Sequence, residues 1–333
     1  MLLSRRAALA ASAAAALSLS ACGDDPTPGT GSTASGTPAA AGGFPVTIPT
    51  KFGDVTLEQA PQRVVALGWG DAETALALGV QPVGASDWLA FGGEGVGPWA
   101  TGRYTSAPEL IGTLEPSYEA IAALRPDLVL DVKSSGDEDR HAKLSAIAPT
   151  LGVPADGESY LTGLEDQVTM IAQALGKASA GQDLLDDIDA AFEQAAAAHP
   201  QWRDRTVTAA ARTSEGWGAY VEGSERVQFM ERLGFVQNPQ VAALPVAEGG
   251  FTVDVSNEQL NLLDADALVA FPIYVPATAI TADPLWTAIP AVAAGRALVL
   301  DEDVSSAYSL GSVLSVRYAL DALVPQLERI LPA

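Results

Sequence analysis

Cysteine and histidine are scarce in this chain of 333 residues. Cys22 is the only cysteine, so no disulfide can form within the chain, and His141 and His199 are the only histidines. Zinc and most transition-metal sites draw on several His and Cys ligands. The composition therefore predicts no metal centre made from side chains of the usual ligand types.

Basic residues are also few compared with acidic ones. The chain has 18 Lys and Arg against 41 Asp and Glu, which gives a formal net charge of −23. A surface of this sign repels the phosphate backbone, so nucleic acid is excluded as a partner. The acidity by itself indicates a composition suited to solubility and points to no particular site.

Apolar runs long enough to cross a membrane are absent, since a span takes roughly 20 apolar residues. The apolar run at residues 7–19 is too short, follows Arg5 and Arg6, and ends just before Cys22. This layout is typical of a secretory signal. We therefore expect an exported protein that is soluble apart from any anchor.

The sequence Leu19-Ser20-Ala21-Cys22 resembles the lipobox of bacterial lipoproteins. The resemblance implies that residues 1–22 are a lipoprotein signal peptide and that Cys22 is diacylated, which anchors the protein to the outer face of the cytoplasmic membrane. An ordinary signal peptide with an incidental cysteine is the alternative. Arg5 and Arg6 leave both general secretory and twin-arginine export open.

Residues 23–43 are rich in Gly, Thr, Ser, Pro and Ala and have little to bury. This composition predicts a flexible linker. About 290 residues follow, which is too many for one small core and suits two lobes of ordinary domain size.

Strand-like and helical patterns alternate along those residues. Strand-like runs occur at residues 63–67, 80–85, 127–132, 206–211, 266–271 and 296–300, and helical patterns at 71–78, 118–124, 226–233, 256–263 and 313–331. Strands separated by single helices predict parallel sheets with right-handed crossovers. Residues 118–132 and 258–271 share one pattern, a short helix leading straight into an apolar strand, which predicts two similar lobes.

A long helical pattern separates the two series of strands. Apolar residues recur at helical spacing over residues 161–175 and 182–198, and the second piece contains no Gly or Pro. About 20 helical residues would span about 30 Å and connect the lobes rigidly. The expected organisation is an N-terminal lobe at 44–176, a connecting helix at 177–200 and a C-terminal lobe at 201–333.

Five stretches together resemble the siderophore-binding branch of the periplasmic binding proteins that have a single helical connector. They are Pro61-Gln-Arg-Val-Val-Ala-Leu67 with Glu73 and Leu78-Gly79, Glu115-Pro-Ser-Tyr-Glu-Ala-Ile-Ala-Ala-Leu-Arg-Pro-Asp-Leu-Val-Leu130, and the stretches at 144–150, 283–299 and 310–321. The resemblance implies an α/β fold of two doubly wound lobes with mainly parallel sheets, joined by one long α-helix, with a ligand cleft between the lobes.

The same resemblance implies a monomeric substrate-binding component of an ABC importer, which captures a ferric siderophore and delivers it to a permease with its ATPase. No intrinsic cofactor is expected, because the iron arrives already chelated. Few cations argue against a highly anionic catecholate, so a hydroxamate siderophore is preferred. A cobalamin or haem binder on the same fold is the alternative.

An anchored surface hydrolase or an adaptor is the alternative from another class. The chain contains no Gly-x-Ser-x-Gly, no Gly-rich phosphate loop and no pattern for a His-centred triad. These absences favour a protein that is not an enzyme.

Candidate ligand-binding residues are aromatic or cationic and lie in loops that follow strands, where such sheets bind ligands. They are Trp69, Trp88, Arg103 and Tyr104 in the first lobe and Arg212, Trp217, Tyr220, Tyr274 and Tyr308 in the second. Arg212 is suited to hydroxamate or carboxylate oxygens. Each aromatic residue has ordinary packing as its alternative role.

Glu73 and Glu231 lie in contexts that resemble the importer-docking glutamates of the family. The resemblance implies that each is presented on a helix surface, outside the cleft, where it meets an arginine of the permease. Glu222 is the alternative to Glu231 in the second lobe.

Overall fold

The computed structural model describes residues 43–157, 159–247 and 250–332. The expected signal peptide at 1–22, its Cys22, and all but the last residue of the expected linker at 23–43 lie outside the described residues. Within the described ranges, no helix combines the length and apolarity that a membrane span requires.

The first lobe is built on a five-stranded parallel sheet with strand order β5-β4-β3-β6-β7. Its strands are β3 (Val64–Ala66), β4 (Gly84–Ser86), β5 (Glu109–Ile111), β6 (Leu128–Leu130) and β7 (Thr150–Leu151). Its helices are α1 (Asp71–Ala77), η1 (Pro98–Ala100), α2 (Tyr118–Leu124), α3 (Glu138–Ser145) and α4 (Leu164–Ala174). An antiparallel hairpin of β1 (Val46–Thr50) and β2 (Gly53–Leu57) packs beside α4.

Both faces of this sheet are covered, which explains why its central strands β3 and β6 are apolar at every position. Val64 and Ala66 of β3 pack into one hydrophobic cluster, while Val65 packs into the cluster on the opposite face. Leu128 and Val129 of β6 alternate between the same two clusters. The strand-like runs at 63–67 and 127–132 therefore form the buried centre of the lobe.

The second lobe is built on a six-stranded sheet with the order β11-β9-β8-β12-β13, and β10 also pairs with β8. Strands β8 (Thr206–Arg212), β10 (Val236–Gln237), β12 (Ala267–Pro272) and β13 (Ala297–Val299) are parallel, whereas β9 (Trp217–Tyr220) and β11 (Thr252–Val255) form an antiparallel edge. The helical segments are η2 (Pro200–Trp202), α6 (Glu225–Arg232), α7 (Pro239–Ala242), η3 (Asn257–Leu263), α8 (Thr278–Thr281), α9 (Pro284–Thr287), α10 (Pro290–Ala293), α11 (Glu302–Leu310) and α12 (Val313–Ile330).

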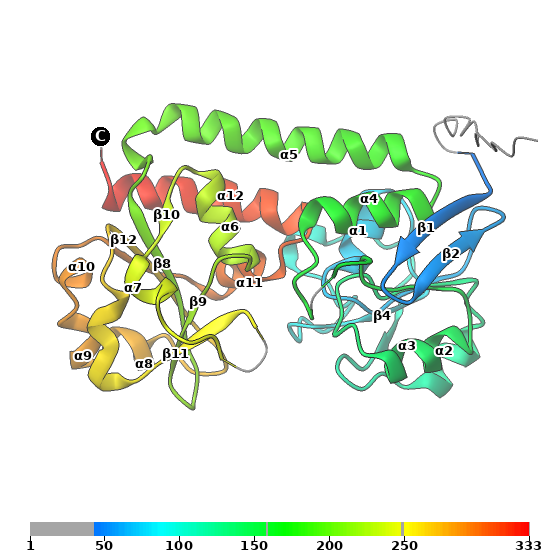
Figure 1. Ribbon diagram of the computed structural model, residues 1–333, viewed down its shortest axis with the longest axis horizontal. Helices are drawn as coiled ribbons and strands as arrows, with labels where there is room; N and C mark the ends of the chain where they lie inside the picture. Colours follow the sequence, from blue (N-terminus) through cyan, green and yellow to red (C-terminus); the bar gives the residue numbers. More distant parts are fainter. Residues whose placement is uncertain (1–42, 158, 248–249, 333) are drawn as a thin grey trace, which may run out of the picture. The chain divides into compact units, whose positions relative to one another are not determined.

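One helix of 21 residues, α5 (Ala178–Ala198), joins the two lobes. Its buried residues Gly181, Leu185, Ile188 and Phe192 repeat at helical spacing, so one face packs inward along its length. Gly181 allows a close approach to α4, because a Cβ there would lie 2.4 Å from the Cβ of Ala172. Figure 1 shows α5 running past both lobes with α12 beside it.

The expected fold class is confirmed: the chain forms two α/β lobes with mainly parallel sheets, joined by one long α-helix. The helix expected at 118–124 is α2. Two of the expected elements differ locally. The strand expected at 80–85 starts only at Gly84 and ends at Ser86, because Pro82 lacks the N–H for a central strand. The helix expected at 256–263 is the 3₁₀ segment η3.

Candidate ligand-binding cleft

Trp69 lies directly after β3, at the carboxyl end of the first sheet. It is held in a tight turn: a Cβ at Gly68 would lie 2.2 Å from the Asp71 carboxylate, and Gly70 has a φ of 80°. The Trp69 carbonyl oxygen accepts a hydrogen bond from Gln167 at 2.8 Å. Its indole Nε1 donates to the carbonyl oxygen of Leu310 in the second lobe, also at 2.8 Å. Trp69 therefore has a fixed orientation between the lobes.

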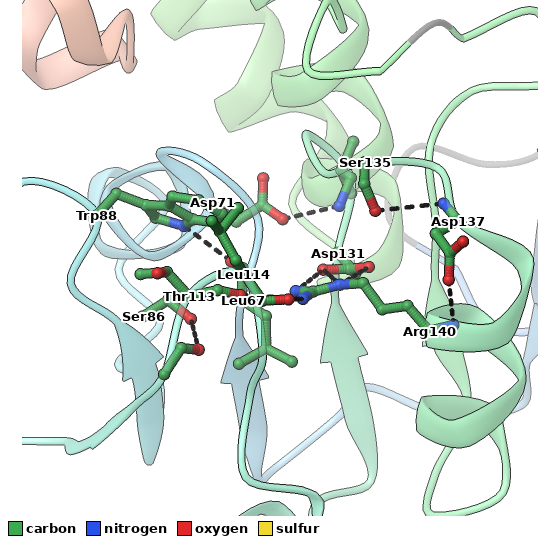
Figure 2. A network of polar contacts seen from close by, with 12 residues as sticks. Leu67, Asp71, Ser86, Trp88, Thr113, Leu114, Asp131, Ser135, Asp137 and Arg140 are labelled. Atoms are coloured by element: carbon green, nitrogen blue, oxygen red, sulfur yellow. Dashed lines mark hydrogen bonds and ion pairs between the residues drawn. The ribbon is translucent and has the colours of Figure 1, made fainter. Parts of the chain in front are cut away.

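Two more aromatic rings continue from Trp69. The ring of Trp88 lies 5.5 Å from that of Trp69 at an interplanar angle of 50°, and 5.7 Å from that of Tyr160 at 75°. Figure 2 shows the indole of Trp88 donating to the carbonyl oxygen of Leu67, at 2.9 Å. The three rings form an ordered aromatic wall, here defined as Trp69, Trp88 and Tyr160.

Two cavities of about 230 and 570 Å³ lie against Trp69 and Trp88 of this wall. Both are lined by Trp69, Trp88, Arg226 and Ser309, so they are two parts of one cleft between the lobes. The smaller part also has Leu114, Lys133, Tyr160, Glu225 and Phe251, and the larger part has residues 271–277, Asp301 and Glu302. The cleft thus combines aromatic faces with a small number of charged groups.

Lys133 and Glu225 form an ion pair across the floor of the smaller part. The Lys133 Nζ is 2.6 Å from a Glu225 carboxylate oxygen, and the two side chains are only 4% and 14% exposed. Lys133 follows β6 in the first lobe, whereas Glu225 is the first residue of α6 in the second. The pair therefore connects the lobes at the bottom of the cleft.

Arg226 contributes the second cation of the cleft. Its guanidinium carbon lies 4.3 Å from the centre of the Tyr220 ring and 5.9 Å from that of Phe271. The hydroxyl group of Tyr308 donates to the Arg226 backbone carbonyl at 2.5 Å. The buried Nε of Arg226 has no hydrogen-bond partner among the described residues. Packing on these rings thus orients the guanidinium, and Arg226 lines both parts of the cleft, where a guanidinium is suited to oxygens of a ligand.

A buried Arg–Asp pair supports the cleft edge in the first lobe. The guanidinium of Arg140 donates to both carboxylate oxygens of Asp131 at 2.8 to 3.2 Å, and it also donates to the carbonyl oxygens of Thr113 and Leu114. Figure 2 shows these groups together. Since Leu114 lines the cleft, Arg140 holds the loop that forms this part of the rim.

Asp71 lies fully buried below the cleft floor. Its carboxylate accepts hydrogen bonds from the backbone N–H of Val132 at 2.8 Å and from Gln167 Nε2 at 2.7 Å. Burial raises the pKa of Asp71 to about 7, and the two hydrogen bonds oppose that rise. Asp71 thereby links the turn that carries Trp69 to the segment that carries Lys133.

Three of the predicted ligand-binding residues, Trp69, Trp88 and Tyr274, line the cleft. Tyr274 follows β12 and is 91% exposed, at the outer end of the larger part.

Four other predicted residues of the second lobe do not line the cleft. Trp217 is buried and stacks on Trp286 with ring centres 5.3 Å apart. Tyr220 and Tyr308 are also core residues, and they contact Arg226 from below. The guanidinium of Arg212 folds back onto the carbonyl oxygen of Thr213. Packing inside the lobe occupies these side chains, so the expectation of direct exposure to the cleft is corrected.

Arg103 and Tyr104 also lie away from the cleft. Arg103 is exposed beside a separate cavity formed with α5 and α12, and Tyr104 is buried. The loop that carries them extends toward the connecting helix, so the expectation for these two residues is corrected as well.

Glu73 is not at a surface, and the expectation that α1 presents it to the importer is wrong. Its side chain is buried, with the whole residue 2% exposed. The carboxylate accepts hydrogen bonds from Trp99 Nε1 at 2.8 Å, from the Gly97 N–H at 3.3 Å and from the hydroxyl group of Ser312. Burial raises the pKa of Glu73.

Glu231 is half-buried on α6, and Glu222 nearby is exposed. Burial, together with the charge of Glu222, raises the pKa of Glu231. The next residue, Arg232, pairs with Asp189 of α5.

The sequence reasoning missed Lys133, Tyr160, Glu225, Arg226 and Phe251. Lys133 directly follows the strand expected at 127–132, so the rule that ligands bind at the carboxyl ends of strands pointed to it. Arg226 begins the helix expected at 226–233, but nothing local indicated that the helix starts at the cleft. Tyr160 and Phe251 lie in loops without a recognisable pattern.

No group of three or more His, Cys, Asp or Glu side chains that could hold a metal ion occurs among residues 43–157, 159–247 and 250–332. Within these residues, the chemistry that the cleft offers is aromatic contact, hydrogen bonding and charge. Sites that bind organic molecules are typically lined in this way.

Comparisons with known proteins agree with this geometry. The probable siderophore-binding lipoprotein YfiY of Bacillus subtilis is 28% identical over 272 residues, which cover 78% of this chain and 81% of the relative. A periplasmic solute binding protein from Mycobacterium smegmatis has a crystal structure with a TM-score of 0.76 and 30% identity, covering 86% of this chain and 98% of that one. The Fe3+-Desferal bound siderophore binding protein FhuD of Vibrio cholerae has a TM-score of 0.61 and 26% identity, covering 81% and 99%.

The family model described as periplasmic binding protein matches residues 64–304, a range that begins at β3 and ends in α11. It includes both sheets, the connecting helix and every cleft residue described above except Ser309. The chain therefore belongs to the periplasmic binding protein family.

Proposed function

We propose that this protein captures a ferric siderophore in the interlobe cleft and delivers it, as a monomer, to an ABC importer. The observation that supports this most strongly is the aromatic wall opposite the guanidinium of Arg226, with the two lobes on either side. The printed names of the Bacillus subtilis and Vibrio cholerae relatives, both siderophore-binding proteins, favour the same ligand class.

The ligand that this cleft suits is a ferric hydroxamate. Such a chelate has an organic shell that stacks on Trp69, Trp88 and Tyr160, and its oxygens accept hydrogen bonds from Arg226. The iron stays within its chelator, and the protein holds the outer surface of the complex. A tris-catecholate carries a large negative charge and would need more cations than the described cleft offers.

Titration with a panel of chelates, monitored by tryptophan fluorescence and by absorbance of the retained ligand, tests this function. The panel contains ferric hydroxamates, a ferric tris-catecholate, ferric citrate, haem and cobalamin. We expect the tightest binding for a ferric hydroxamate. Retention of haem or cobalamin alone would contradict the siderophore function, and tighter binding of the tris-catecholate would contradict the hydroxamate preference.

For delivery, we propose that the importer contacts the cleft side of the molecule through Glu119 and Glu258. Each is exposed in the first turn of a helical segment, α2 or η3, that leads into a central strand of its own sheet. Both segments begin at the carboxyl ends of the parallel strands. α2 follows the carboxyl end of β5. η3 follows Val255, which is paired through Trp217 with Arg212, the last residue of β8. Exposed carboxylates at the cleft side are suited to arginines of a permease.

Charge reversal tests whether the importer contacts Glu119 and Glu258 or contacts Glu231, the docking residue expected from the sequence. Glu119→Lys combined with Glu258→Lys should reduce ferric siderophore uptake strongly and leave the affinity of the isolated protein unchanged. Glu231→Lys is the matched control on α6 and should preserve uptake. Loss of uptake in the Glu231→Lys protein, with normal uptake in the double variant, would return the docking role to Glu231.

We further propose that Cys22 is diacylated and holds the exported protein at the outer face of the cytoplasmic membrane. Cys22→Ser should abolish incorporation of labelled fatty acid and release the protein from the membrane fraction. Unchanged membrane association and labelling in this variant would exclude the anchor at Cys22.

A further inference from the structure

The ion pair of Lys133 and Glu225 lies on the floor of the cleft and connects residues 92 positions apart in the sequence. Lys133 is almost completely buried, and its Nζ is 2.6 Å from Glu225. An uncompensated ammonium group in such a place would be costly. Glu225 therefore cancels a positive charge that would otherwise act on any ligand in the smaller part of the cleft.

The other charged residues that line the cleft do not give it a net positive charge. Among the described lining residues, the bases are Lys133 and Arg226, and the acids are Glu225, Asp301 and Glu302. Asp301 and Glu302 are exposed at the rim of the larger part. With Lys133 neutralised, the remaining charged lining residues are Arg226 and two rim carboxylates, so the cleft carries no excess of positive charge.

We propose that Glu225 is a specificity-determining residue that, by neutralising Lys133 across the floor, makes the cleft select ferric chelates that are uncharged or positively charged over anionic ones. This inference rests on the proposed function and narrows its ligand class by net charge. Removal of the Glu225 charge would expose the ligand to the full charge of Lys133. An anionic chelate gains from this change and an uncharged chelate does not.

Four variants separate charge from structure. Glu225→Gln keeps the size of the side chain and removes its charge, and Lys133→Met removes the opposite charge. The double variant Lys133→Met with Glu225→Gln removes both. Asp189→Asn is the control. Like Glu225→Gln, it replaces a paired carboxylate by an amide, but Asp189 pairs with Arg232 outside the cleft.

The probes are ferrichrome as an uncharged ferric complex and ferric dicitrate as an anionic one, both at pH 7 and low ionic strength. In the Glu225→Gln protein, the affinity for ferric dicitrate relative to ferrichrome should rise by about ten-fold or more, as expected for one unit charge several ångströms away in a partly buried site. Lys133→Met should lower the same ratio. The double variant and Asp189→Asn should return ratios close to that of the unmodified protein.

A ratio that stays constant in Glu225→Gln and Lys133→Met proteins that still bind ferrichrome would overturn the inference. If a single variant does not fold, the double variant has no buried unpaired charge, and the remaining single variant still gives the sign of the effect. Absence of binding of either chelate to the unmodified protein would instead contradict the proposed function, so the two failures are distinguishable.

Discussion

Glu73 in α1 accepts a hydrogen bond from the hydroxyl group of Ser312 at the start of α12, although the two residues are 239 positions apart. Ser312 is the N-cap of α12, and its hydroxyl oxygen also accepts from the N–H of Ser315. Both residues are buried. A carboxyl group of the first lobe is therefore joined to the terminal helix of the second, so Glu73 serves in the contact between the lobes.

Ser312→Ala should lower the free energy of unfolding by about 2 kcal/mol. The change removes a helix cap and leaves the buried Glu73 carboxyl group without one of its donors. Ser306→Ala, a half-buried serine on α11, is the control and should change the free energy by no more than about 0.5 kcal/mol. Urea denaturation of the three proteins measures both values, and equal effects of the two substitutions would show that the Glu73 contact contributes nothing.

Asp71 should make stability decrease as the pH rises. Burial raises its folded-state pKa from 3.8 to about 7, so the folded protein binds more protons than the unfolded chain between these values. This contribution is fully present below about pH 4 and is lost as the pH rises to about 7. Relative to Asp71→Asn, the free energy of unfolding of the unmodified protein should therefore fall by about 2 kcal/mol between pH 5 and pH 7. Denaturation curves at both pH values give this difference, and a difference independent of pH would refute the assignment.

Tryptophan replacements should locate the bound chelate. Trp69→Phe and Trp88→Phe should each weaken binding of a ferric hydroxamate by roughly three- to ten-fold, because each reduces stacking surface in the aromatic wall and removes an indole hydrogen bond. Both should also reduce the amplitude of fluorescence quenching. Trp202→Phe is the control, since Trp202 is buried against His199 in the second lobe. Greater loss of affinity or quenching in the control than in either cleft variant would place the ligand elsewhere.

Arg140→Met should lower the free energy of unfolding by about 3 to 5 kcal/mol, because it leaves the Asp131 carboxylate buried without its partner. Arg317→Met removes the same kind of pair from an exposed place, where Arg317 contacts Asp321, and should cost less than about 1 kcal/mol. Thermal and urea denaturation of both variants test the comparison. Similar losses in the two proteins would mean that burial of the Arg140 pair has little effect.

Some of the predicted cleft residues could be recognised from their neighbours in the sequence, and others could not. Trp69 follows a strand and a glycine, so its place at the carboxyl end of the sheet could be deduced from neighbouring residues alone. Tyr220 and Tyr308 are also expected in loops that follow strands, yet Tyr220 lies in β9, Tyr308 lies in α11, and both belong to the core. Which side of a strand or helix faces the cleft depends on the elements that pack against it, and no local pattern contains that information.

The sequence by itself determined the alternation of strands and helices, the long connecting helix and the family, because hydrophobic periodicity and short motifs are local properties of the chain. The tertiary structure alone decided that Glu73 is buried, that Lys133 meets Glu225 and that Arg226 rests on Tyr220. The first two facts depend on segments far apart in the sequence, and the third depends on how the turn between β9 and α6 folds. A charged side chain on a helix is usually solvated, and only the packing of a second lobe against it turns that residue into a buried partner.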